Sequence, residues 1–282
     1  MPVVVGTGGW SAEEWYPSGL APRDRLSWYA ERFEGVEVDS TFYALPGRRT
    51  VARWASITPP EFSFDIKLHR LLSRHAAPLS SLPTDLRPDV EVNERGRVVL
   101  QPELEEAMLR RTLEVTAPLH EAGKLNSFLL QLTPAFNPAG HQLDELVGVV
   151  QALAPVPVAI ELRHRDWLRD PDATLGWFRD EGAAFVCVDA PDVDAPVVLP
   201  PFDAVARHDL AYLRAHGRNA KGYLRGRTAG ERFAWEYSEE ELEEIADRTR
   251  RLAREAETVR LMFANGGHAL AAARRMREIL SV

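Results

Sequence analysis

Cysteine is almost absent from this sequence, because Cys187 is the only one in 282 residues. A single cysteine excludes an internal disulfide and a cluster of thiolate metal ligands. Its expected place is a buried position on a strand, where a free cysteine packs as a small apolar side chain. The shortage agrees with a reducing compartment, and we expect a cytoplasmic protein.

Long apolar runs are also missing, and no stretch approaches the roughly 18 consecutive apolar residues of a membrane-spanning helix. The N-terminal stretch MPVVVGTGG has neither the basic region nor the long apolar region of a secretion signal. We therefore expect no membrane partner. With 45% hydrophobic and 27% charged residues, the composition is that of a folded, core-forming protein.

Positive charge is not in excess, since the formal net charge is −8. Bulk binding to nucleic acid or to an anionic membrane is therefore disfavoured, although a local pocket for one small anion is compatible with this charge. Several catalytic motifs are missing too. The glycines of GTGGWS have the wrong spacing for a dinucleotide-binding G-x-G-x-x-G, and neither G-x-S-x-G nor H-E-x-x-H occurs.

Short β-like runs alternate with helical patterns along the whole chain. Eight such runs occur, at residues 3–9, 35–43, 62–68, 127–132, 156–162, 183–190, 211–217 and 258–266. Helical patterns lie at about 22–33, 48–57, 103–122, 141–153, 172–181, 238–256 and 267–280. Strands that alternate with helices pair in parallel through right-handed crossovers, and eight of them can close a barrel. We predict an α/β fold, a (β/α)8 TIM-type barrel that fills residues 1–282 as a single domain, with an open doubly wound sheet as the alternative.

Two connections depart from this regular repeat. The segment after the third strand is long, and VEVNERGRVVL within it predicts a hairpin turned at Asn93 to Gly96. Between the sixth and seventh strands, PDVDAPVVLPPFDAVARHD is too rich in proline for a normal crossover helix. We expect a hairpin-bearing insertion after strand 3 and an irregular crossover between strands 6 and 7.

The alternation of side chains within each strand separates two faces. In the fifth run, Val158, Ile160 and Leu162 share one face, and Glu161 and Arg163 share the other. The apolar face should pack on the surrounding helices, so the polar face should point into the barrel, where charges must be paired. Polar residues also gather near the carboxyl ends of the strands, where barrel enzymes have their active sites. We expect these side chains to converge at one mouth of the barrel.

The candidate site is drawn from these strand ends and from the loops that follow them. The expected catalytic residues, which carry carboxylate or imidazole groups, are Glu37, Glu161, His164, Asp189 and His216. The expected substrate-binding residues, which carry cationic, amide, hydroxyl or aromatic groups, are Thr41, Tyr43, Lys67, Gln131, Arg163, Trp167, Arg214 and Asn265. Carboxylates and imidazoles can exchange protons with a substrate, while cations can hold an anionic one.

Several stretches of the chain together resemble the YecE-like family, known as domain of unknown function seventy-two. In order, they are GTGGWSAEEWYPSGL, RLSWYAERFEGVEVDSTFY, TVARWASITPPEFSFDIK, LLQLTPAFN, ELRHRDW, DAP, RAHGRN, YSEEELEEI and FANGGHALAAA. They extend from about residue 5 to residue 275, so the resemblance covers nearly the whole chain. It implies a TIM-type barrel and no established activity. The characteristic polar residues that it implies are Glu37, Ser40, Thr41, Lys67, Gln131, Glu161, Arg163, His164, Asp189, Arg214, His216 and Asn265.

Three functions are compatible with these residues. The first is an enzyme without a cofactor that performs general acid–base chemistry, of hydrolase or phosphodiester type, on a small anionic or sugar-like substrate. The second is a metal-dependent hydrolase or nuclease whose divalent metal would be bound by Glu37, Asp39, Glu161 and Asp189. The third is a barrel that binds a ligand or partner without converting it. The cations expected at the same mouth would compete with a metal for the carboxylates, which favours the first hypothesis.

Overall fold

The computed structural model describes residues 3–191, 193, 195–226 and 228–282. Over these residues it has eight strands, which pair in the order β1-β8-β7-β6-β5-β4-β3-β2, and every pair is parallel. The strands are β1 (Val3–Thr7), β2 (Gly35–Val38), β3 (Ser63–Lys67), β4 (Leu125–Gln131), β5 (Val158–Glu161), β6 (Ala184–Asp189), β7 (Ala211–Ala215) and β8 (Val259–Phe263). Each strand overlaps one of the predicted runs.

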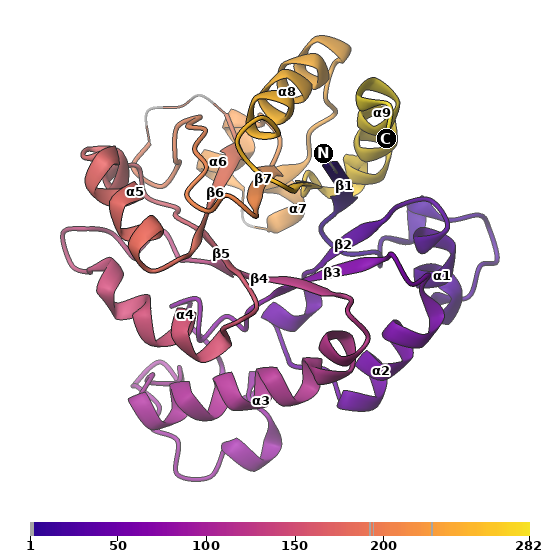
Figure 1. The fold of residues 1–282 in the computed structure, drawn as a ribbon. Helices are drawn as coiled ribbons and strands as arrows, with labels where there is room; N and C mark the ends of the chain where they lie inside the picture. The colour runs from indigo at the N-terminus through magenta and orange to yellow at the C-terminus, as the bar shows by residue number, and fades with distance from the viewer. Residues whose placement is uncertain (1–2, 192, 194, 227) are drawn as a thin grey trace.

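The sheet closes between β1 and β2. Just beyond β1, Gly8 forms a parallel bridge with Glu37 of β2, and the N–H of Gly9 donates to the Glu37 carbonyl oxygen at 2.7 Å. Figure 1 shows the strands at the centre, with helices around them and the last helix, α9 (Ala269–Leu280), beside β1. The predicted (β/α)8 barrel is confirmed.

Helices cover the outside of this barrel (Figure 1). Those before α9 are α1 (Arg25–Ala30), α2 (Arg48–Ile57), α3 (Pro102–Glu121), α4 (Val147–Leu153), α5 (Pro171–Asp180), α6 (Ala220–Arg225), α7 (Ala229–Phe233) and α8 (Glu239–Leu252). α8 begins where the sequence predicts, because Ser238 and Glu241 each accept the backbone N–H of the other. In the described part of the chain, no helix combines the length and the apolar character needed to cross a lipid bilayer.

The sequence does not predict α6 and α7, because helices of six and five residues carry little periodic signal. They depend on local caps and turns instead. The Asn219 side chain caps α6 by accepting the N–H of Gly222 at 2.8 Å. Gly217, with a φ of +84°, forms the turn that leads from β7 into α6. This segment places the Phe233 ring 5.3 Å from the ring of His216.

Both predicted irregular connections are confirmed. In the insertion after β3, Asn93 donates its N–H to the Arg97 carbonyl oxygen at 2.8 Å, and Gly96 completes the hairpin turn with a φ of +65°. Between β6 and β7, none of the described residues 190–191, 193 and 195–210 is helical. Asp192 and Asp194 of this crossover lie outside the described residues.

The amino-terminal half of the barrel interior contains a buried ion pair between Asp65 of β3 and Arg260 of β8. The Nε and Nη2 of Arg260 donate to Asp65 Oδ2 at 2.8 and 2.5 Å, and Ser127 Oγ donates to Asp65 Oδ1 at 2.7 Å. Both charged side chains are at most 1% exposed. A Cβ atom on Gly35 would lie 2.6 Å from Arg260 Nη2, so glycine leaves the space that the guanidinium occupies.

Replacement of Asp65 with alanine should destabilise the barrel strongly, because it leaves Arg260 buried without its carboxylate. Breaking a buried pair in this way costs about 3–5 kcal/mol, which urea unfolding at neutral pH would measure. The matched control is Asp85→Ala, since Asp85 is 59% exposed and pairs with Arg111 at the surface. The control should change the free energy of unfolding far less, and equal losses in the two variants would contradict this account of the interior.

Candidate active site at the barrel mouth

Arg214 of β7 is the centre of a buried cluster at the carboxyl end of the barrel. Its Nε and Nη2 donate to the Glu37 carboxylate at 2.9 and 2.6 Å, and its Nη1 donates to Glu161 Oε2 at 2.5 Å. The Tyr212 hydroxyl also donates to Glu37, at 3.1 Å. Glu37, Glu161 and Arg214 are at most 1% exposed. Arg214 therefore joins β2, β5 and β7, and its predicted contact with a substrate would compete with two carboxylates.

His216 follows β7 and joins this cluster through Glu161. Its Nε2 lies 3.0 Å from Glu161 Oε1, which also accepts a hydrogen bond from Gln131 Nε2 at 3.0 Å. The His216 Nδ1 is buried and has no hydrogen-bond partner among the described residues. A proton on Nδ1 would be a buried donor without an acceptor, which is costly. Arg214 Nη1, which can only donate, also lies 3.2 Å from Nε2. The closer Glu161 carboxylate can only accept, so together with an Nδ1 that has no partner in the described ranges it favours the neutral tautomer with the proton on Nε2.

The charges of these groups follow from their surroundings. Burial lowers the pKa of His216 to about 4, although Glu161 acts in the opposite direction, so the imidazole is neutral at pH 7. Burial also opposes ionisation of Glu161, but His216, Arg214 and Arg163 outweigh it and hold the pKa of this carboxyl well below its ordinary value. Burial raises the pKa of Glu37 to about 7, although Arg214 favours its ionised form. The mouth thus pairs a neutral imidazole with an ionised carboxylate.

Lys67 and Arg163 lie beside this cluster with looser ion pairs. The Lys67 Nζ is 3.5 Å from Asp39 Oδ1, and Arg163 Nη1 is 3.5 Å from Glu161 Oε1. Charge-assisted hydrogen bonds are shorter, at about 2.7–2.9 Å. Burial would raise the pKa of Asp39, but Lys67 and Arg214 hold it below its ordinary value. Asp39 Oδ1 still has no hydrogen-bond partner among the described residues, so these cations keep donor capacity.

Thr41 and Asn265 are buried at the mouth and contact the backbone. Thr41 Oγ1 lies 2.7 and 2.6 Å from the carbonyl oxygens of Val38 and Lys67, and so links the ends of β2 and β3. The Asn265 Nδ2 donates to the Trp235 carbonyl oxygen at 2.8 Å. Its Oδ1 has no partner in the described ranges. The Thr41 hydroxyl therefore interacts with the backbone, whereas the Asn265 side chain keeps one acceptor oxygen for a ligand.

His164 and Trp167 do not join the cluster. His164 lies beyond the end of β5, and its Nδ1 accepts the N–H of Asp166 at 3.3 Å. Trp167 is buried, with its Nε1 donating to the Phe136 carbonyl oxygen at 2.9 Å and its ring stacked on that of Phe136. Tyr43 is instead 59% exposed. Of the two predicted aromatic contacts, Tyr43 is the one that a ligand can reach.

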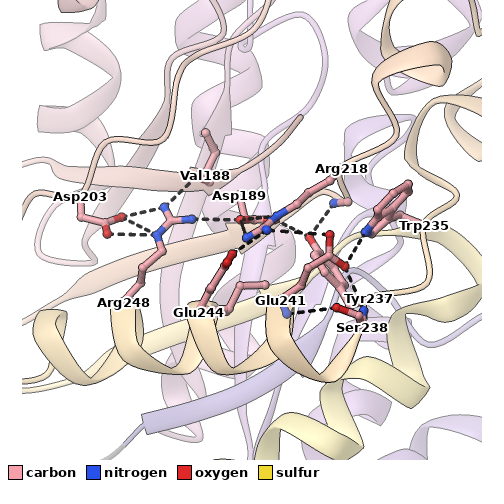
Figure 2. Close-up of polar contacts among 12 residues, drawn as sticks. Val188, Asp189, Asp203, Arg218, Trp235, Tyr237, Ser238, Glu241, Glu244 and Arg248 are labelled. Atoms are coloured by element: carbon pink, nitrogen blue, oxygen red, sulfur yellow. Dashed lines mark hydrogen bonds and ion pairs between the residues drawn. The ribbon is translucent and has the colours of Figure 1, made fainter. Parts of the chain in front are cut away.

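Asp189 does not meet the cluster as predicted, because its side chain points to the helices outside the barrel. In β6 it shares a face with Phe185, whose ring packs on Phe178 of α5. Its Oδ1 accepts hydrogen bonds from Arg218 Nη2 at 2.9 Å and from Arg248 Nη1 at 3.1 Å, beside α8 (Figure 2). Two guanidinium groups thus neutralise this carboxylate.

This outer network nevertheless positions His216. The Tyr237 hydroxyl donates to Asp189 Oδ2 at 2.8 Å and accepts the N–H of Gly217 at 2.8 Å (Figure 2). The N–H of His216 donates to the Asp189 carbonyl oxygen at 2.9 Å. A Cβ atom on Gly217 would lie 2.6 Å from the Cβ of Trp235, so the turn requires glycine. Asp189 therefore fixes the turn that carries His216.

Three residues of this outer network, Arg218, Tyr237 and Arg248, are not predicted from the sequence. Tyr237 and Arg248 lie before and within α8, where the amphipathic pattern of a surface helix does not distinguish them from packing residues. The available signal was Arg218, which stands two residues after His216 in the stretch HGRN. Arg218 and Asp189 are far apart in the sequence, so their contact in the folded protein could not be predicted.

The carboxylates considered as metal ligands do not form a set. Arg214 bridges Glu37 and Glu161, and Asp189 points out of the barrel. Within residues 3–191, 193, 195–226 and 228–282, no three His, Cys, Asp or Glu side chains have the arrangement of a metal site. A guanidinium already occupies the position between the two inner carboxylates, so they do not fit a divalent metal.

The model of the family described as protein of unknown function DUF72 matches residues 4–282 of this chain. The chain belongs to the DUF72 family. The UPF0759 protein YunF of Bacillus subtilis (strain 168) is 26% identical to this DUF72 member over 99% of the chain and 95% of its own length. The UPF0759 protein YecE of Escherichia coli (strain K12) is 35% identical over 27% of the chain and 26% of its own length.

Crystal structures of DUF72 family proteins are similar to it over the whole barrel. The one from Enterococcus faecalis V583 has 25% sequence identity and a TM-score of 0.78, over 99% of this chain and 98% of the other. The one from Thermotoga maritima MSB8 has 26% identity and a TM-score of 0.78, over 99% of both chains. The resemblance to the YecE-like family is confirmed.

His216 should make the stability of this DUF72 protein depend on pH. Its pKa is about 4 in the folded protein and about 6.5 in an unfolded chain, so between these values the unfolded state alone takes up the proton. Stability should fall as the pH is lowered from about 6.5 to 4, by up to about 1.4 kcal/mol per pH unit for this group. Urea unfolding at several pH values should show that wild type loses more stability than His216→Gln.

The other buried histidines provide an internal control for this comparison. Burial also lowers the pKa values of His69 and His75 to about 4, and both groups are present in wild type and variant alike. Parallel pH profiles of the two proteins would contradict a buried, neutral His216.

Proposed function

We propose that this DUF72 protein is an enzyme of hydrolase or phosphodiester type that performs general acid–base chemistry on a small anionic or sugar-like substrate. The observation that supports this most directly is the His216 imidazole. Its Nε2 lies 3.0 Å from Glu161, and its buried Nδ1 lacks a partner among the described residues. A general base needs a lone pair that no protein group occupies, and a neighbouring carboxylate stabilises the charge it acquires.

In the proposed reaction, His216 Nδ1 accepts a proton from a water molecule or a substrate hydroxyl, which attacks the substrate. Glu161 stabilises the resulting imidazolium, and Gln131 and Arg214 hold its carboxylate in place. Burial keeps the imidazole unprotonated before binding. A bound anion would raise its proton affinity, so proton transfer is favoured in the complex. The proton then passes from Nδ1 to the leaving group.

Glu37 and Asp189 have supporting roles in this proposal. Both Glu37 oxygens accept hydrogen bonds from Arg214, and the Glu37 side chain is fully buried. It therefore holds Arg214, which in turn holds Glu161. Asp189 acts on His216 through the turn after β7. Neither carboxylate is free to meet a substrate directly.

The proposal is tested on a panel of chromogenic phosphodiesters, phosphomonoesters and glycosides. On a substrate that wild type converts, Glu161→Gln and His216→Gln should each lower kcat/KM by about 10²–10⁴-fold, the range of acid–base catalysis. The control is Glu121→Gln, whose side chain is 64% exposed and pairs with Arg48 outside both the cluster and the outer network. It should retain wild-type activity.

Undiminished kcat/KM in a folded His216→Gln variant would overturn the proposed base. A protein that only binds its ligand would convert no member of the panel. Mass spectrometry would then find a small molecule that purifies with the protein and is recovered unchanged after incubation.

A further inference from the structure

Phe42, which follows β2, is the centre of a basic cluster that the proposed acid–base pair does not use. The Lys67 Nζ lies 4.8 Å and the Arg70 Cζ lies 5.7 Å from the centroid of its ring. The rings of His75 and Tyr43 meet it edge to face, with centroids 5.1 and 5.2 Å away. Phe42 is buried and Tyr43 is exposed, so the cluster reaches the surface at Tyr43.

The cations of this side of the mouth have unused donors. In the described part of the chain, the Arg70 side chain forms no hydrogen bond or ion pair, and its Nε is buried without a partner. Lys67 and Arg163 approach carboxylates only to 3.5 Å. The interior cations Arg214 and Arg260 differ, because each donates to a carboxylate at 2.5 Å. The two interior arginines are therefore held by short bonds, whereas Lys67 and Arg163 are paired loosely and Arg70 has no partner of this kind in the described ranges.

Burial and the three mouth cations together lower the pKa of His75. Burial lowers its pKa to about 4 against a hydrogen bond with the Gln131 carbonyl, and Arg163, Lys67 and Arg70 lower it further. Its Nε2 lies 3.2 Å from that carbonyl oxygen. Cations that lie close together in a partly buried space repel one another. A bound anion would offset this repulsion.

Gln131 connects the basic cluster to the acid–base pair. Its side-chain amide donates to Glu161 at 3.0 Å, while its backbone carbonyl oxygen lies 3.2 Å from His75 Nε2. Arg163 also belongs to both groups, since its guanidinium lies 3.5 Å from Glu161. A group bound by these cations would therefore lie next to the Glu161–His216 pair.

We propose that Lys67, Arg70 and Arg163 form a subsite for an anionic group of the substrate, a phosphate or a carboxylate, with the exposed Tyr43 ring as its outer wall. The inference deepens the proposed function and rests on it for the position of the reacting bond. Arg70 is the residue that decides it, because none of the described residues accepts a hydrogen bond from its guanidinium or forms an ion pair with it.

Isothermal titration calorimetry with inorganic phosphate, and separately with acetate, tests the subsite against chloride at equal ionic strength. Wild type should bind at least one of these anions saturably. Arg70→Gln should raise its Kd about tenfold, the effect of losing one charge-assisted hydrogen bond. Without added anion, the Tm of Arg70→Gln should equal or exceed that of wild type, because the substitution removes repulsion and breaks no hydrogen bond or ion pair among the described residues.

The matched control is Arg110→Gln on α3, which changes the net charge equally. Arg110 is 64% exposed and pairs with Glu106, away from the mouth. This variant should bind the anion as wild type does. Arg70→Lys should recover part of the lost affinity, because it restores the charge without the planar guanidinium.

The outcomes separate this inference from the proposed function. Binding of phosphate alone, or of acetate alone, identifies the anionic group, whereas no binding beyond that of chloride overturns the subsite. Equal loss in Arg70→Gln and Arg110→Gln also overturns it. Anion binding that needs Arg70 and persists in His216→Gln supports the subsite even if no substrate is converted. Turnover that needs His216 without any Arg70-dependent anion binding rejects the subsite alone.

Discussion

A buried arginine between two carboxylates is the interaction on which the rest of this barrel depends. Arg214 lies where water does not reach, and a buried charge without its partner would cost about 3–5 kcal/mol. Its bonds to Glu37 and Glu161 therefore fix β2, β5 and β7 relative to one another. Asp65 and Arg260 form a second pair nearer the amino-terminal end. Paired charges, together with apolar side chains, fill the interior of this closed barrel.

Pairing divides the polar residues of the barrel into two groups. The first group is satisfied by the fold and includes the two interior arginines with their carboxylates. The second group lies at the mouth and keeps unsatisfied atoms in the described part of the chain, among them His216 Nδ1, Asp39 Oδ1 and Asn265 Oδ1. The first group stabilises the barrel and orients Glu161. The second group keeps buried polar atoms that a ligand entering the mouth could pair with, which is why chemistry is expected there.

The barrel itself could be predicted from the sequence, because eight β-like runs with helices between them allow few other folds. Convergence of Glu37, Lys67, Glu161, Arg214 and His216 could be predicted as well, from strand alternation and from their places near strand ends. The position of Asp189 near a strand end was not enough to predict where its side chain points. Asp189 lies on the same face of β6 as Phe185, and this face packs against the helices. The pairing of polar groups depends on distances between strands. The sequence does not contain these distances. Arg214 and Lys67 are both predicted to bind substrate, yet only Arg214 is held by short bonds to two carboxylates.

Neutron diffraction from deuterium-exchanged crystals at pH 7 locates the protons on the buried groups at the mouth, and so shows whether His216 has the lone pair that acid–base chemistry needs. We expect deuterium on His216 Nε2, directed at Glu161, and none on His216 Nδ1 or on the Glu161 carboxylate. Deuterium on both imidazole nitrogens, or on Nδ1 alone, would contradict the proposed function, because the lone pair that the proposed chemistry requires would then be absent.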